Sequence, residues 1–157
     1  MQDLVDELYR KHGAELTAAL AISSRDWQTA EDLCHEVFIV ALDRQDQLRQ
    51  HANPRGWLFQ TGYNMARNRL RLLFRRRHKV AQEHPVMTDI AWHRALELSD
   101  SLNYLSARQR DAVVLHYYFG FSVSETSHVL GCSQTAVKTH LQRARATLGN
   151  LLSPEAE

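Results

Sequence analysis

The amino-acid sequence predicts an all-helical protein built as two small bundles. Apolar residues recur at steps of three and four along most of the 157 residues, and no alternating pattern of convincing length predicts a strand. A polar stretch at 80–90 contains Pro85 and is typical of a flexible linker. A glycine turn near the C-terminus lies between two short helical patterns. We therefore expect an all-α fold with bundles in residues 1–79 and 91–153, the second containing a helix-turn-helix.

The first bundle is expected to begin with helices at 3–22 and 27–42. Asp26 is placed to cap the second of these helices. The inner face of that helix is apolar at Ala30, Leu33, Cys34, Val37, Phe38 and Ala41, and its other face carries Asp32, His35, Glu36, Ile39 and Asp43. An exposed isoleucine among acidic residues favours a protein-binding surface, whereas a helix buried on two sides is the alternative.

The next helix is predicted to start firmly after a polar connector at 43–52. Asn53 supplies the cap, Pro54 is the first helical residue, and the pattern continues past Leu73. One stripe of amides and arginines follows its outer face over roughly four turns: Gln60, Asn64, Arg67, Arg71 and Arg75. Phe59 and Tyr63 lie beside this stripe and would stack on unpaired bases, unless they belong to the core as most aromatic residues at helical spacing do.

The second bundle is expected to hold a helix at 91–104 and another that Ser106 caps and Gly120 ends. The helix-turn-helix follows. Ser122 and Glu125 form a capping box, Gly131 ends the first helix, and Ser133 caps the second.

The second helix of this motif has one apolar stripe and one polar face. The stripe is Val137, Leu141, Ala144 and Leu148, and the polar face has no acidic residue: Gln134, Thr135, Lys138, Thr139, Gln142, Arg143 and Arg145. Hydroxyls, amides and cations hydrogen-bond base edges and pair with phosphates, so this face predicts DNA binding. An ordinary two-helix corner with a solvated face is the alternative.

Composition and charge exclude several other classes of protein. Residues 1–50 hold ten acidic and five basic side chains, whereas residues 51–80 hold eight basic and none acidic, so two surfaces with different partners are expected. No apolar run approaches the roughly 20 residues of a membrane span, and we expect a cytoplasmic protein without membrane insertion. Cys34 and Cys132 lack metal-ligand spacing, and the nine histidines are scattered, so we expect no metal and no cofactor.

Four signatures occur in order along nearly the whole chain. They are Ala30–Phe38, then Pro54–Phe59 followed by Asn64, Asn68 and Arg69, then Leu105–Arg110, then the helix-turn-helix with Thr135–Thr139 and Arg143–Arg145. Together they resemble bacterial RNA polymerase sigma factors of the extracytoplasmic-function group, the minimal kind with only the second and fourth conserved regions. His35 departs from the glutamine that is commoner at its position in the family.

The resemblance implies three binding surfaces. Asp32, His35, Glu36 and Ile39 would contact the clamp helices of the largest subunit of core RNA polymerase, with the polymerase flap as a further partner. The non-template strand of the minus-10 element, with one base flipped out of the stack, would be bound by Asn53, Gln60, Asn64, Arg67, Asn68, Arg71 and Arg75. The minus-35 element would be read as duplex by Ser133, Gln134, Thr135, Lys138, Thr139, Gln142 and Arg143.

The resemblance also implies that the chain is not an enzyme. It would supply promoter specificity and strand opening while the polymerase performs phosphoryl transfer, and an anti-sigma protein covering the same surfaces is a candidate partner. Two other hypotheses are a stand-alone helix-turn-helix regulator and a helical metal-dependent enzyme that uses the histidines. The regulator would leave the Ile39 face and the Asn64 stripe without a role.

Overall fold

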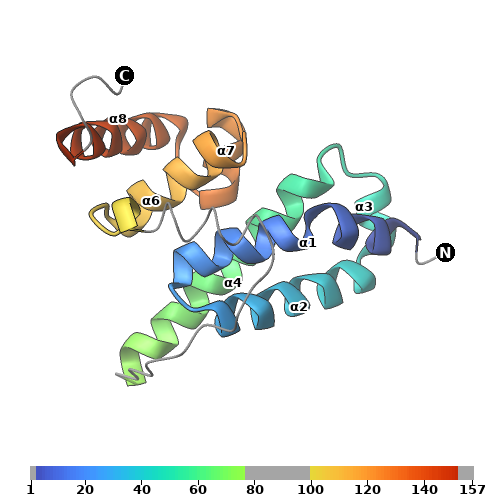
Figure 1. Cartoon of the computed structure of the whole chain (residues 1–157). Helices are drawn as coiled ribbons and strands as arrows, with labels where there is room; N and C mark the ends of the chain where they lie inside the picture. Colours follow the sequence, from blue (N-terminus) through green and yellow to red (C-terminus); the bar gives the residue numbers. More distant parts are fainter. Residues whose placement is uncertain (1–2, 77–99, 152–157) are drawn as a thin grey trace.

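The first bundle contains four helices. The computed structural model describes residues 3–76 and 100–151, and in these residues the expected all-α class is confirmed. The helices are α1 (Asp3–Ser24), α2 (Trp27–Asp43), α3 (Gln45–Arg49) and α4 (Pro54–Arg76). Helices α1, α2 and α4 lie against one another (Figure 1) and bury Leu16, Leu20, Leu33, Val37 and Leu58 almost completely. Burying each leucine stabilises the fold by roughly 1.5–3 kcal/mol.

The start of α2 follows the sequence prediction, whereas the connector after it does not. The Asp26 carboxylate accepts from the backbone N–H of Thr29, so it caps α2. The polar connector expected at 43–52 instead contains α3, because Leu48 is buried against the bundle and gives this polar segment an apolar anchor. Arg49 pairs with Asp46 along the exposed side of α3 at 3.1 Å.

The second bundle contains α6 (Ala107–Val113), the π-helical turn η1 (Val114–Tyr118), α7 (Val123–Leu130) and α8 (Gln134–Leu151). The helix predicted at 91–104 is described only from residue 100, and the predicted linker at 80–90 lies outside the described residues. One continuous helix was expected between Ser106 and Gly120, but its second half widens into η1, where the N–H of Phe119 donates to the carbonyl of Val114 at 3.0 Å.

The predicted helix ends of the helix-turn-helix are confirmed. Ser122 and Glu125 form a reciprocal capping box at the start of α7. Gly131 ends α7 with a φ of 67°, a left-handed conformation that glycine adopts at least cost. The Ser133 hydroxyl accepts from the N–H of Ala136 at 3.0 Å and caps α8.

The two bundles pack against each other. In Figure 1, α6, α7 and α8 gather on one side of the first bundle, and α7 lies against α4. The ring of Phe59 in α4 lies 4.9 Å from the ring of Phe121 and 5.7 Å from the ring of Phe119, measured between centroids. The apolar cores of the two bundles therefore join into one cluster.

Candidate nucleic-acid interface

The polar side of α8 is open to solvent. Val137, Leu141 and Ala144 are buried, and the opposite side exposes what we call the α8 face: Gln134, Thr135, Lys138, Gln142 and Arg143, with half-buried Thr139 beside them. The Thr139 hydroxyl donates to the carbonyl of Thr135 at 3.0 Å, while Ser133 caps the helix. The sequence prediction of one buried stripe and one polar face is thus confirmed for α8.

The electrostatics of α8 favour an anionic partner. The described part of the α8 face has no carboxylate, and its cations reach solvent. His140 lies at the edge of the buried stripe, where burial lowers the pKa of its imidazole and the charges of Arg108 and Arg143 lower it further. The positive charge of this face near pH 7 therefore comes from lysine and arginine.

A second polar surface runs along α4. Gln60, Asn64, Asn68 and Arg71 are exposed and Arg67 is half-buried, and we call these five residues the α4 face. Arg75 lies in the last turn of α4, and its side chain is outside the described part of the chain. The four-residue and three-residue steps that predicted the stripe do bring its described members to one side of the helix.

Arg67 joins the α4 face to the second bundle. One of its terminal nitrogens donates to the carbonyl of Leu130 at 3.0 Å, and the other donates to the side-chain oxygen of Asn64. Burial lowers the pKa of the Arg67 guanidinium, and the neighbouring charge of Arg108 lowers it further. Because the carbonyl of Leu130 lies at the C-terminus of α7, where a helix carries partial negative charge, this is a favourable place for a guanidinium.

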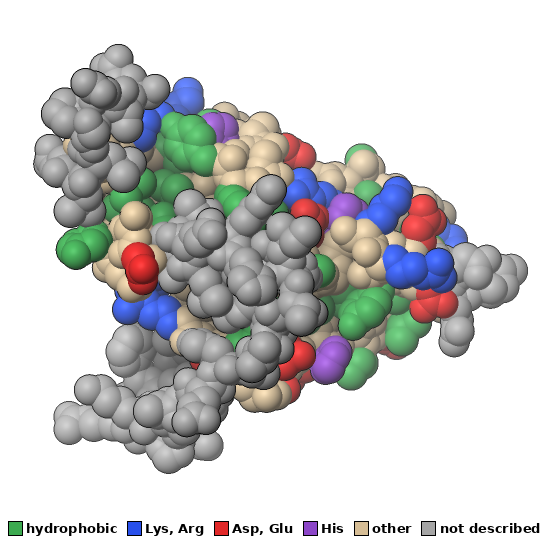
Figure 2. Space-filling view, in the orientation of Figure 1, with side chains coloured by type: hydrophobic (Ala, Val, Ile, Leu, Met, Phe, Trp, Pro, Cys, Tyr) green, Lys and Arg blue, Asp and Glu red, His purple; other side chains and the backbone are tan. Residues whose placement is uncertain are grey.

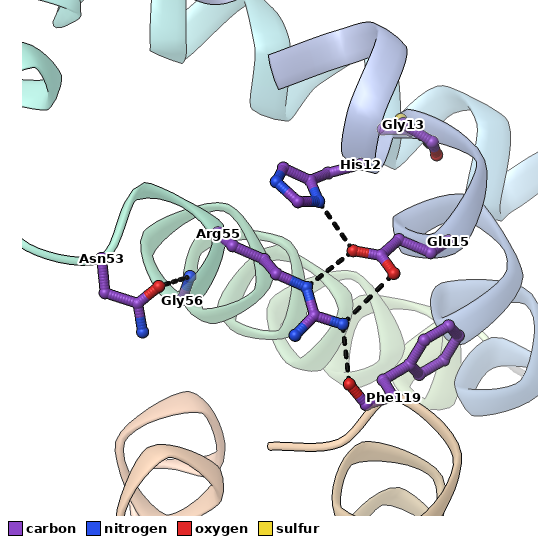
Figure 3. Close-up of polar contacts among 8 residues, drawn as sticks. His12, Gly13, Glu15, Asn53, Arg55, Gly56 and Phe119 are labelled. Carbon is purple, nitrogen blue, oxygen red and sulfur yellow. Dashed lines mark hydrogen bonds and ion pairs between the residues drawn. The ribbon is translucent and has the colours of Figure 1, made fainter. Parts of the chain in front are cut away.

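Asn53 also contacts the second bundle while it caps α4. Its side-chain oxygen accepts from the N–H of Gly56 at 3.0 Å (Figure 3), and its side-chain nitrogen donates to the carboxylate of Glu125 at 3.1 Å. A Cβ at residue 56 would lie 2.6 Å from that nitrogen, so a residue with a side chain there would displace the Asn53 amide from this position. Hydrogen bonds from the Ser122 backbone lower the pKa of Glu125, and Asn53 contributes to the shift.

Arg55 is a central residue that the sequence analysis missed. It pairs with Glu15 through two nitrogens at 2.7 and 3.2 Å and donates to the carbonyl of Phe119 at 2.8 Å (Figure 3). His12 contacts the same Glu15 carboxylate at 2.8 Å. The guanidinium carbon lies 4.2 Å from the centroid of the Phe121 ring, a cation–π distance. Arg55 therefore connects α1 and α4 to the segment that precedes α7.

Phe59 and Tyr63 are core residues rather than exposed stacking surfaces. Both are about 1% exposed or less, and Phe59 lies under the rings of Phe119 and Phe121. The hydroxyl of Tyr63 has no hydrogen-bond partner among the described residues. The core alternative, which the helical spacing favoured, therefore holds for both.

The outer side of α2 presents an apolar side chain among polar ones. Asp32, His35, Glu36 and Ile39 are exposed, Ile39 to 64%, and we call these four residues the α2 face. Leu42, one turn beyond Ile39, is also exposed. Figure 2 shows hydrophobic side chains with histidine and acidic residues beside them over this part of the surface. The alternative of a helix buried on two sides does not hold, because the buried residues of α2 occupy one side only.

A charged cluster lies where α6 meets the first bundle, and no sequence pattern indicated it. Arg110 is 6% exposed and donates to the carbonyl of Ser23 at 3.4 Å. Burial raises the pKa of the neighbouring Asp111 carboxyl to about 6, while Arg110, the Ser23 hydroxyl, Arg108 and Arg67 act in the opposite direction. Tertiary packing alone creates this cluster.

The described residues hold neither a grouped metal site nor a membrane-spanning helix. Within residues 3–76 and 100–151, no three side chains of His, Cys, Asp or Glu are grouped in a way that would hold a metal ion. None of the helices described in those ranges is long and apolar enough to cross a membrane. Cys34 and Cys132 are both free thiols.

Comparison with known proteins assigns both bundles. Residues 8–77 match the family model for Sigma-70 region 2, and residues 95–148 match the one for Sigma-70 region 4. The chain is 30% identical over 151 residues to the ECF RNA polymerase sigma factor SigM of Mycobacterium tuberculosis, covering 94% of this chain and 76% of that protein. It is 23% identical over 166 residues to the RNA polymerase sigma factor YlaC of Bacillus subtilis, covering 99% and 96%.

Two solved structures share the whole arrangement. The sigma factor RpoE of Bartonella quintana, solved in complex with the anti-sigma factor NepR, has a TM-score of 0.80 at 26% identity, with 100% of both chains covered. CnrH, solved in complex with the cytosolic domain of CnrY, has a TM-score of 0.70 at 26% identity and covers 99% of this chain and 92% of its own. From its two region models and its whole-length relatives, the chain belongs to the sigma-70 family of RNA polymerase sigma factors, in the extracytoplasmic-function (ECF) group.

Proposed function

We propose that this sigma factor binds core RNA polymerase through the α2 face and directs it to promoters through the α4 and α8 faces. The observation that carries the proposal is the placement of these three surfaces on three helices. An apolar centre with a polar rim suits a protein partner, and it lies on α2, away from the cationic side of α8. In this assignment residues 1–79 form the region 2 domain and residues 91–153 the region 4 domain.

The α8 face is assigned to the duplex minus-35 element. A helix that follows a glycine turn and presents lysine, arginine, threonine and glutamine fits the major groove, where these side chains distinguish base pairs. Lys138, Gln142 and Arg143 are exposed along two successive turns, so they would reach adjacent base pairs. Ser133, Gln134, Thr135 and Thr139 complete the set at the start of the helix.

The α4 face, together with Asn53 and Arg75, is assigned to the melted minus-10 element. Unstacking a base costs a few kcal/mol, so opening requires a surface that binds the single strand better than the duplex. Exposed amides such as Asn64 and Asn68 hydrogen-bond the edges of unpaired bases, and arginines such as Arg71 follow the phosphates. This assignment needs no catalytic group and no cofactor, because the polymerase performs the chemistry.

An anti-sigma protein is a further candidate partner, and the cytoplasm is the proposed compartment. RpoE was solved with the anti-sigma factor NepR, and CnrH was solved with the cytosolic domain of CnrY, which supports an anti-sigma protein as a binding partner of this chain as well. We place the chain in the cytoplasm because its proposed partner, core RNA polymerase, works on the chromosome there.

Run-off transcription tests the proposal directly. Core polymerase is mixed with this protein and with restriction fragments of the source genome, and transcripts are mapped. Initiation at defined sites that depends on the protein supports the assignment. Core polymerase that starts no better with the protein than without it contradicts the assignment. Sequence-specific binding to duplex DNA in the absence of polymerase would favour the stand-alone regulator, which the comparisons do not favour.

A further inference from the structure

A cavity of about 360 Å³ lies between α1 and α2, which run side by side in the first bundle (Figure 1). Its volume falls within the range of sites that bind small molecules, roughly 300–1,000 Å³. Gly13 and Ala14 supply little side-chain volume on the α1 side of the cavity. A Cβ on residue 13 would lie 3.3 Å from the ring of Tyr9, so glycine also lets this ring lie close to the helix at the edge of the cavity.

The inner wall of the cavity is uncharged. Thr17, Trp27 and Cys34 line it and are each less than 10% exposed. The hydroxyl of Thr17 donates to the carbonyl of Gly13 at 2.8 Å, and the thiol of Cys34 donates to the same carbonyl at 3.7 Å. Burial raises the pKa of the Cys34 thiol, so it stays protonated near pH 7. Because the hydroxyl and the thiol already have an acceptor, this wall suits the apolar part of a ligand.

The outer part of the cavity carries one charge of each sign. Arg10 of α1 is exposed and Glu31 of α2 is half-buried, and both line the cavity. In the described ranges 3–76 and 100–151, neither residue takes part in an ion pair. The charge of Glu31 acts on the Cys34 thiol, which places the carboxylate near the inner wall. A zwitterion would satisfy both side chains through charge-assisted hydrogen bonds.

Two aromatic side chains indicate the kind of apolar group that fits. The ring of Tyr9 is 50% exposed and meets the ring of Phe38 edge-on, with the centroids 5.0 Å apart. Trp27 lines the cavity one helical turn before Glu31. Aromatic rings attract one another in edge-on and offset arrangements beyond the effect of their buried area. An aromatic ligand therefore gains more from these walls than an aliphatic one of the same size.

We propose that the cavity between α1 and α2 binds a free amino acid with an aromatic side chain, whose ammonium group pairs with Glu31 and whose carboxylate pairs with Arg10. This site is separate from the α4 and α8 faces, and it shares His35 with the α2 face. A bound ligand would therefore lie beside the proposed polymerase interface. The test needs neither polymerase nor DNA, so its outcome is independent of the proposed function.

Three variants alter the cavity, and two controls leave it intact. Arg10→Gln and Glu31→Gln each remove one charge at a position outside the buried core, and Ala14→Leu fills the cavity from an exposed position. Lys11→Gln removes an exposed cation from α1, and Asp43→Asn removes an exposed carboxylate from α2, both away from the lining. Circular dichroism and thermal unfolding establish that every protein of the set is folded.

Isothermal titration calorimetry measures binding of L-phenylalanine and two analogues, phenethylamine without the carboxylate and phenylpropionate without the ammonium group. We expect one saturable site for L-phenylalanine on the wild type and weaker binding of L-leucine. Arg10→Gln and Glu31→Gln should each lower the affinity for L-phenylalanine at least about tenfold, because each loses a charged hydrogen-bond partner. Arg10→Gln should not weaken phenethylamine, and Glu31→Gln should not weaken phenylpropionate, since these analogues lack the group in question.

The inference is overturned if L-phenylalanine gives no saturable binding to the wild type. It is also overturned if Ala14→Leu binds as tightly as the wild type, because the ligand would then lie elsewhere. Equal losses in the two charge variants and in Lys11→Gln and Asp43→Asn would contradict the assigned pairing and point to a general effect of charge. L-leucine that binds as tightly as L-phenylalanine would contradict the aromatic class of ligand.

Discussion

The carboxylate of Glu36 binds the guanidinium of Arg69 at 2.9 Å, and this ion pair joins α2 to α4. Both side chains are partly exposed, so the pair contributes only about 0–1 kcal/mol to stability. Its position matters more, because it connects the helix assigned to the polymerase with the helix assigned to the single strand. Glu36 is therefore shared between a partner inside the chain and its proposed role at the polymerase, whereas Ile39 on the same face projects freely into solvent.

Polymerase binding is expected to depend on Asp32 and Ile39. The double substitution Asp32→Ala and Ile39→Ala removes a charge and an apolar side chain that is 64% exposed, so the fold should keep its melting temperature. The affinity for core polymerase, measured by fluorescence anisotropy of the labelled protein, should fall by at least tenfold, about 1.4 kcal/mol. Asp46→Ala, at an exposed carboxylate on α3, is the control. Equal affinities of the double variant and the wild type would remove the α2 face from the polymerase interface.

Strand opening is expected to depend on Asn64. Asn64→Ala removes an exposed amide and leaves the core unchanged, because residue 64 lies on the outer side of α4. Unpaired thymines in the polymerase–promoter complex should become less reactive to permanganate, while binding to a minus-35 duplex stays at the wild-type level. Gln142→Ala should give the reverse pattern, because Gln142 lies on α8. Normal permanganate reactivity in Asn64→Ala would refute the role of Asn64 in melting.

Arg143 is expected to read a base edge. Replacing it with alanine should cost about 1–3 kcal/mol of binding free energy at the preferred minus-35 sequence and relax the preference at one position. The measurement is anisotropy on a set of duplexes that differ by single base pairs. Arg145→Ala is the control on the same helix, because the Arg145 guanidinium hydrogen-bonds the Tyr117 hydroxyl. A loss that is uniform across sequences, with a shallower salt dependence, would make Arg143 a phosphate contact instead.

Stability is expected to fall as pH rises through the titration of Asp111. Burial raises the pKa of its carboxyl from 3.8 to about 6, so the folded chain holds a proton there that the unfolded chain has lost. Between those two values the folded state binds more protons, and the free energy of unfolding decreases with rising pH, by at most about 3 kcal/mol. The decrease should be complete above about pH 6.

Asp111→Asn tests this pH dependence. Its amide cannot ionise, so the decrease between pH 3.8 and 6 should become shallower, and the variant should exceed the wild type in stability above that range. Urea unfolding across the range, with Asp6→Asn at an exposed site on α1 as control, measures the difference. Parallel pH profiles of the wild type and Asp111→Asn would show that this carboxyl is not the group responsible.

The helices with local end signals were predictable, and the features created by tertiary packing were not. Ser122, Gly131 and Ser133 fix the ends of α7 and α8 through hydrogen bonds that reach only a few residues, so the sequence alone places those ends. Helix α3 was missed because its only apolar anchor is Leu48, and one buried residue produces no periodicity.

The candidate surfaces also include features that the sequence predicts and features that only tertiary packing creates. The α8 face follows from helical spacing, because everything opposite Val137 and Leu141 must face away from the core. Arg55 gave no such signal, since its partners Glu15 and Phe119 lie 40 and 64 residues away in the chain. Spacing also placed Arg67 on the stripe without indicating that the carbonyl of Leu130 would engage it.

The π-helical turn at Val114–Tyr118 holds one more residue than an α-helical turn would. Deleting one of its residues would restore an ordinary α-helical turn and leave the helix faces before and after it in phase, because the wide turn absorbs the extra residue. A deletion in the regular helix α6 would instead rotate everything after it by about 100°, and Phe119 and Phe121 would swing away from Phe59. The chain between Ser106 and Ser122 can thus lose a residue at the π-helical turn, but not in α6, and still let the two halves of this sigma factor meet in the same way.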